Sequence, residues 1–167
     1  PLDCSSLDEF ARQLNISTAN IGWCCDPLAE ISAMVYCSGA TPNRVQKIAM
    51  IGMGLTGSIP TFTSFPSLVE LEVASNRLSG SLPSDFLGAS PDLVKLDIAN
   101  NDFSGIVPAL DKNSRLEYLA FYSNALSGTL PSFSSLPALS VLGAGNCLFH
   151  GPFPDFVHNP NLSEVYL

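Results

Sequence analysis

Residues 71–83 read LEVASNRLSGSLP, and this stretch decides the fold because it recurs along the chain. Aligned on the final proline, the other copies are IAMIGMGLTGSIP at 48–60, LDIANNDFSGIVP at 96–108, LAFYSNALSGTLP at 119–131 and LGAGNCLFHGPFP at 142–154. The prolines follow one another at intervals of 23, 25, 23 and 23 residues. A fixed period of this length predicts a solenoid, in which each unit buries its apolar face only by stacking on the next.

Each position of the unit has a physical role. Apolar residues such as Leu71 and Val73 alternate as in a short strand, so strands of successive units can pair in parallel. The Gly permits a backbone conformation that strains other residues, and the Pro ends strand pairing because it lacks an N–H. An Asn that turns the chain and can bond backbone groups of neighbouring coils recurs as Asn76, Asn101 and Asn124. An aromatic residue or Leu should return to the core from the convex side at Phe62, Phe86, Leu110, Phe133 and Phe156.

Two units have another residue at the Asn position, Met53 in the first unit and Cys147 in the last complete one. We expect Cys147 to be a buried structural thiol. Like the recurring Asn residues, which together form an Asn ladder along the stack, it would donate a hydrogen bond to a neighbouring coil, but a weak one. A reactive thiol would need an exposed, electropositive setting. A sixth unit begins at Leu162 and stops at Leu167 inside a strand, so we expect either that the native chain continues or that this end docks onto another surface.

Composition excludes several classes of function. The net charge is −8, and the 7 Lys and Arg residues are scattered, which argues against nucleic-acid binding. No apolar run reaches the roughly 18 to 20 residues of a membrane-spanning helix. The chain starts at Pro1 without an export-signal pattern, and we expect that signal to have been removed from a secreted, extracellular protein.

The cysteines favour a disulfide-stapled end. Four of the five lie in the first 37 residues, as Cys4, Cys24, Cys25 and Cys37. Zinc sites prefer paired Cys-x-x-Cys ligands with His nearby, and both histidines are far away in the sequence, so we expect no metal and no other cofactor. Two glycosylation sequons, at Asn15 and Asn161, agree with export.

The endings LTGSIP, LSGSLP and LSGTLP resemble the plant-type extracellular leucine-rich-repeat family, which includes polygalacturonase-inhibiting proteins and the ectodomains of receptor-like kinases. The block with Trp23, Cys24, Cys25 and Cys37 is similar to the cysteine-paired cap of that family. A secreted fungal or oomycete relative with the same repeat pattern is the alternative origin.

The resemblance implies an α/β solenoid, a right-handed superhelix with a parallel concave sheet. It further implies disulfides Cys4–Cys24 and Cys25–Cys37, and a cap helix around residues 6–14. Leu7, Phe10, Ala11 and Leu14 recur at helical spacing and would cover the first coil. We divide the chain into a cap, 1–44, and repeats, 45–167, of which five are complete and the sixth is truncated.

The concave sheet face is the expected binding surface, because solenoids present it as an extended platform. Its predicted partner-binding residues are Lys47, Glu70, Glu72, Lys95, Asp97, Tyr118, Tyr122 and Tyr166. One row should alternate in charge, while Glu72 and Asp97 should be adjacent like charges. We interpret this pair as a solvated acidic patch. The alternative, a glycosidase-like carboxylate pair, needs a deep cleft that its small alanine neighbours do not provide.

The tyrosines are typical of protein interfaces, since each offers a large rigid surface and a polar tip. Small residues beside them, Ala120, Gly143 and Gly145, should leave room for a ligand chain. No Ser or Cys is placed to partner His150 or His158 in a nucleophilic triad, so we expect no catalytic residue and no enzymatic activity.

The sequence therefore predicts an extracellular module that binds a protein or peptide, possible partners being a secreted glycosidase or a cell-surface receptor. The alternatives are an inhibitor of a secreted cell-wall hydrolase and a secreted effector.

Overall fold

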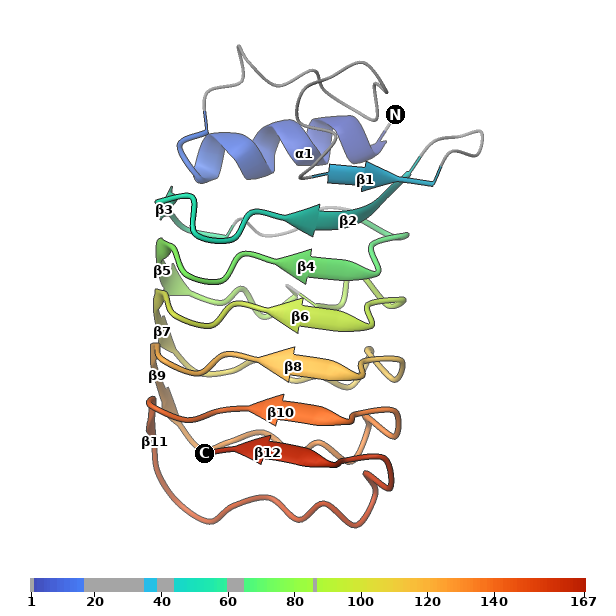
Figure 1. Cartoon of the computed structure of the whole chain (residues 1–167), viewed down its shortest axis with the longest axis vertical. Helices are drawn as coiled ribbons and strands as arrows, with labels where there is room; N and C mark the ends of the chain where they lie inside the picture. The colour runs from blue at the N-terminus through green and yellow to red at the C-terminus, as the bar shows by residue number, and fades with distance from the viewer. Residues whose placement is uncertain (1, 17–34, 39–43, 60–64, 86) are drawn as a thin grey trace.

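The computed structural model describes residues 2–16, 35–38, 44–59, 65–85 and 87–167. Helix α1 (Leu2–Gln13) covers one end of a stack of coils, and the chain descends coil by coil to strand β12 at the other end (Figure 1). Each coil places one strand in a long sheet, and most coils place a second, short strand along the side of the stack. This is the predicted leucine-rich-repeat solenoid.

The long sheet has seven strands in the order β1-β2-β4-β6-β8-β10-β12. All neighbours pair in parallel except β1 and β2, which are antiparallel. The bounds are β1 Val35–Cys37, β2 Val45–Ala49, β4 Glu70–Glu72, β6 Lys95–Asp97, β8 Tyr118–Ala120, β10 Val141–Gly143 and β12 Glu164–Tyr166. The outward side of this sheet is the concave face named above.

A second sheet of five parallel strands was not predicted. Its order is β11-β9-β7-β5-β3, with β3 Thr56–Gly57, β5 Arg77–Ser81, β7 Asp102–Gly105, β9 Ala125–Gly128 and β11 Leu148–Phe149. Four copies of the repeated Gly lie in this sheet and Gly151 follows its last strand, all with φ between +80 and +103°, a conformation that favours glycine, as expected. The strands end before the prolines, which cannot donate to a ladder.

The interior is filled by the repeated apolar residues. Leu71, Leu96, Leu119 and Leu142 are buried at equivalent points of four coils. Among the residues predicted to point into the core from the convex side, Leu110 and Phe133 are buried and Phe156 is half-buried. The Phe156 ring stacks on Phe133 with 6.1 Å between ring centroids. Phe62 and Phe86 lie outside the described residues.

The Asn ladder forms as predicted. The Asn101 side chain donates to the carbonyls of Val73, Ile98 and Ala99 at 3.0–3.1 Å and accepts from the Leu78 N–H at 3.0 Å. Each Asn therefore satisfies backbone groups of its own coil and of the preceding one.

The ladder continues at Cys147 with a weaker partner. The Cys147 thiol donates to the Phe121 carbonyl over 3.4 Å, and burial raises its pKa. It is half-buried, which is more exposed than predicted, but its role in the ladder is the expected one. Met53 at the other end is exposed, and its N–H donates to the Asn76 side chain.

The cap helix begins four residues before the predicted start at residue 6, because apolar spacing defines the packed face and not the first turn. That face is as predicted, with Leu7, Phe10, Ala11 and Leu14 all buried and Phe10 edge-on to Phe65. Cys37 is disulfide-bonded. The implied pairings stay predictions because Cys24 and Cys25 lie outside the described residues. The division into a cap, 1–44, and repeats, 45–167, also stays a prediction.

Candidate binding face

The strand register places the predicted concave residues in two rows. One row runs Lys47, Glu70, Lys95 and Tyr118 across β2, β4, β6 and β8. The next row runs Ala49, Glu72, Asp97 and Ala120 across the same strands. Both rows are those expected from the sequence, because parallel pairing of identical repeats aligns equivalent residues at about 4.8 Å.

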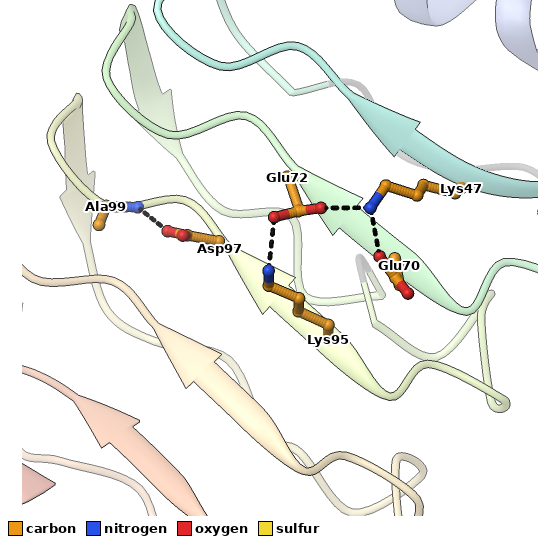
Figure 2. Close-up of polar contacts among 6 residues, drawn as sticks. All are labelled: Lys47, Glu70, Glu72, Lys95, Asp97 and Ala99. Carbon is orange, nitrogen blue, oxygen red and sulfur yellow. Dashed lines mark hydrogen bonds and ion pairs between the residues drawn. The ribbon is translucent and has the colours of Figure 1, made fainter. Parts of the chain in front are cut away.

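The charged residues form a connected ion-pair network (Figure 2). The Lys47 amine lies 2.6 Å from Glu70 and 2.8 Å from Glu72, and the Lys95 amine lies 2.6 Å from the other oxygen of Glu72. Glu72 is therefore held between two lysines on the neighbouring strands. The four side chains carry two positive and two negative charges, so the network is balanced.

This network corrects the expectation of a solvated acidic patch. Glu72 is only 6% exposed, and each of its carboxylate oxygens is paired with a lysine amine of a neighbouring strand. Burial alone would raise the pKa of Glu72, but the hydrogen bonds from Lys47 and Lys95 lower it below its ordinary value. The pKa of Lys47 is raised by its bonds to Glu70 and Glu72. A carboxylate held in this way is poorly suited to act as an acid or a nucleophile.

Asp97 stands outside the network. It is half-buried, and its carboxylate accepts a hydrogen bond of 3.2 Å from the Ala99 N–H. Burial raises the pKa of Asp97, the negative charge of Glu72 acts in the same direction, and Lys95 acts against it. Among the residues that the structure describes, Asp97 forms no ion pair.

A tyrosine lies at each side of the network. The Lys47 amine is 5.9 Å from the ring centroid of Tyr36, and the Lys95 amine is 5.2 Å from that of Tyr118. Both distances suit a cation–π interaction. Tyr36 was not predicted as a site residue, because the antiparallel pairing that sets it opposite Lys47 belongs to the cap and not to the repeat.

The tyrosines predicted at the other end of the face surround a pocket of about 660 Å³. Tyr122 follows the end of β8, one residue beyond a buried Phe121, and is half-buried like Tyr118. Burial raises the pKa of Tyr118, and the nearby charge of Asp97 raises it further. The lining is Tyr118, Ala120, Tyr122, Val141, Gly143, Gly145, Asn146, Val165, Tyr166 and Leu167.

The small residues of this pocket line free space, as expected, and they also make room for other parts of the protein. A Cβ atom at position 143 would lie 2.9 Å from the Tyr122 ring, and one at position 145 would lie 2.9 Å from the Leu167 carbonyl carbon. Gly143 and Gly145 therefore make room for Tyr122 and for the backbone of the next coil as well. Free space remains above them, inside the pocket.

Tyr166 forms the exposed wall of the pocket. Its hydroxyl donates to Glu164 over 2.7 Å, and this bond and the charge of Glu164 raise the pKa of Tyr166. The ring itself stays exposed to solvent.

The two histidines and the predicted glycosylation sites lie away from this face. His150 and His158 are exposed and outside the seven-stranded sheet. The sequon residues Asn15 and Asn161 are also exposed, and their amide nitrogens donate to Thr56 and to the Pro137 carbonyl. In the described part of the chain, no His, Cys, Asp and Glu cluster could hold a metal, and no helix is long and apolar enough to span a membrane.

The family model named Leucine Rich Repeat matches residues 67–89 and 92–113. The chain is 33% identical over 99 residues to the LRR receptor-like serine/threonine-protein kinase GSO2 of Arabidopsis thaliana. This alignment covers 59% of the chain but only 6% of that relative.

Solved structures align over nearly the whole chain. The LRR ectodomain of the receptor kinase SOBIR1 from Arabidopsis thaliana is 29% identical with a TM-score of 0.82, covering 98% of this chain and 90% of that one. The BIR2 ectodomain of the same plant is 30% identical with a TM-score of 0.73, covering 97% and 88%. A chain of the BIR3–SERK2 complex, also from Arabidopsis thaliana, is 26% identical with a TM-score of 0.76, covering 98% and 90%.

Proposed function

Because the chain belongs to the plant-type extracellular leucine-rich-repeat family, we propose that it is an extracellular recognition module that binds a protein or peptide through its concave face. The observation that carries the proposal is the tyrosine pocket beside a prebuilt ion-pair network. A related chain in the BIR3–SERK2 complex supports it, since that structure is a protein assembly.

The geometry suits binding better than catalysis. The ion pairs hold the lysines and glutamates of the network in place before any partner arrives, so less side-chain entropy is lost on binding. The tyrosines add large surfaces of the kind that dominates binding energy at interfaces. Glu72, the most buried carboxylate of the face, is committed to two lysines, and we therefore assign the face no catalytic step.

Selection of displayed random peptides tests this function. Peptides are selected on the whole chain, and their affinities are compared between the wild type and the Tyr118→Ala/Tyr122→Ala variant. We expect a loss of about 30-fold or more, because tyrosine hot spots contribute about 2 kcal/mol.

The matched control removes two exposed apolar side chains elsewhere, in the Ile106→Ala/Leu148→Ala variant. Ile106 and Leu148 are 65% and 64% exposed and lie outside the concave face. Selected peptides should bind this variant like the wild type. Peptides that depend on Ile106 and Leu148 but not on the tyrosines would place the binding surface elsewhere and refute the proposal.

A titration separates recognition from the inhibitor alternative. Saturating amounts of the protein should leave the activity of a secreted polygalacturonase unchanged if the face serves as a recognition module. Stoichiometric loss of activity would favour the inhibitor.

A further inference from the structure

The boundary between the ion-pair network and the tyrosine pocket carries an unbalanced negative charge. In the register of the sheet, Asp97 stands between Glu72 on β4 and Ala120 on β8, and Ala120 lines the pocket. Since Lys47 and Lys95 already balance Glu70 and Glu72, the charge of Asp97 is left over. Asp97 does not itself line the pocket, but its charge raises the pKa of Tyr118, which does. The pocket therefore lies beside a carboxylate that forms no ion pair among the described residues.

The pocket is otherwise suited to a cation that also has apolar surface. Its lining contains no Lys, Arg or His, and three of its residues are tyrosines. The Lys95 amine already lies over Tyr118, so one ring of the pocket accepts a cation in the structure. On the far side, Glu164 adds a second carboxylate beside Tyr166.

We propose that the pocket receives an arginine side chain of the bound peptide, with the guanidinium packed against the tyrosines and hydrogen-bonded to Asp97. This inference rests on the proposed function and names the chemistry of its partner. Arginine fits better than lysine because its planar group stacks on aromatic rings, can form two bonds to one carboxylate and is less strongly hydrated. The net charge of −8 on the whole chain favours the approach of a basic segment.

Two short peptides that differ only in charge test the inference. The probes are acetyl-Gly-Arg-Gly-amide and the same peptide with citrulline, which has the shape of arginine without its charge. Binding to the whole chain is followed by NMR through the backbone amides of Ala120, Gly143 and Gly145. We expect the arginine peptide to bind about tenfold more tightly than the citrulline peptide, since a hydrogen bond to a charged group contributes more than a neutral one.

A pair of matched variants assigns the effect to one carboxylate. Asp97→Asn keeps the acceptor for the Ala99 N–H and should remove the preference for arginine. Asp111→Asn makes the same change of net charge at an exposed position away from the pocket, and should leave the preference intact. Equal affinity of the two peptides for the wild type, or an unchanged preference in Asp97→Asn, would overturn the inference.

The peptide selection described above separates this inference from the proposed function. Selected peptides that depend on Tyr118 and Tyr122 but show no enrichment in arginine would overturn the arginine assignment and leave the recognition function standing. Peptides that ignore the tyrosines would overturn both.

Discussion

Lys95 and Glu72 form an ion pair along a diagonal of the sheet. Their charged atoms are 2.6 Å apart, although the register sets Lys95 opposite Glu70 and Glu72 opposite Asp97. Long side chains reach diagonal neighbours on adjacent strands, and here the diagonal contact gives Glu72 an attractive partner beside the like charge of Asp97. The stability of the face therefore depends more on Glu72 than on Glu70.

Replacing Glu72 with Gln should destabilise the fold by about 1–3 kcal/mol, because two partly buried lysines would lose a charged partner. Urea unfolding at neutral pH measures the change. Glu70→Gln is the control, since Glu70 contacts one lysine and is about one-third exposed, and we expect a loss of about 0–1 kcal/mol. Equal losses in the two variants would contradict the central position of Glu72.

The pH dependence of this difference follows from the lowered pKa of Glu72. A carboxyl group whose pKa is lower in the folded state contributes stability above its unfolded value of 4.5, and that contribution is lost as the pH falls through the folded value. The gap between wild type and Glu72→Gln should therefore close in acid. A gap that does not shrink as the pH falls below 4.5 would assign the loss to packing instead of charge.

Asp97→Asn should have the opposite effect and stabilise the protein at neutral pH, by up to about 1 kcal/mol. Because the pKa of Asp97 is raised in the folded state, ionisation of this group costs folding free energy once the pH rises above its ordinary value of 3.8. Thermal unfolding at neutral pH and below pH 3.8 measures the difference, which should vanish in acid. A less stable Asp97→Asn variant at neutral pH would show that the ionised carboxylate is favoured by contacts in the fold.

Restoring asparagine in the last complete coil should stabilise the ladder. Cys147 makes one long bond, whereas Asn124 makes three donor bonds and accepts a fourth. We expect Cys147→Asn to raise the free energy of unfolding by about 1 kcal/mol, and Asn101→Ala to lower it by about 2 kcal/mol or more. Chemical denaturation of the two variants measures both changes in the free energy of unfolding. No gain in Cys147→Asn would mean that the thiol already satisfies this coil.

Gly143→Ala should weaken peptide binding through Tyr122, because the new methyl group would meet the ring at 2.9 Å and displace it. A double-mutant cycle, with affinities measured for a selected peptide, tests whether Gly143→Ala acts by displacing Tyr122. In the Tyr122→Ala background the Gly143→Ala change should have no further effect. Additive losses would show that residue 143 contacts the peptide itself.

The sequence predicts most of the fold because similar repeats in parallel register determine which residues align, as for Leu71 and Leu96. The second sheet escapes prediction because segments such as Arg77–Ser81 are rich in Ser and Gly and lack an alternating apolar pattern. The diagonal ion pair between Lys95 and Glu72 could not be predicted either, because side-chain torsions, and not the spacing in the sequence, decide which nearby carboxylate the lysine contacts. The pocket was anticipated only in outline, from Tyr118, Tyr122 and Tyr166.

The Asn ladder also sets the order in which the coils complete their hydrogen bonds during synthesis. The Asn76 side chain accepts the N–H groups of Met53 and Leu55, which belong to the preceding coil. As a nascent chain leaves the ribosome, the turn of each coil therefore lacks these two hydrogen bonds until the Asn of the next repeat has been synthesised. Translation speed along the repeats would then set how long each unfinished coil is exposed to chaperones and proteases.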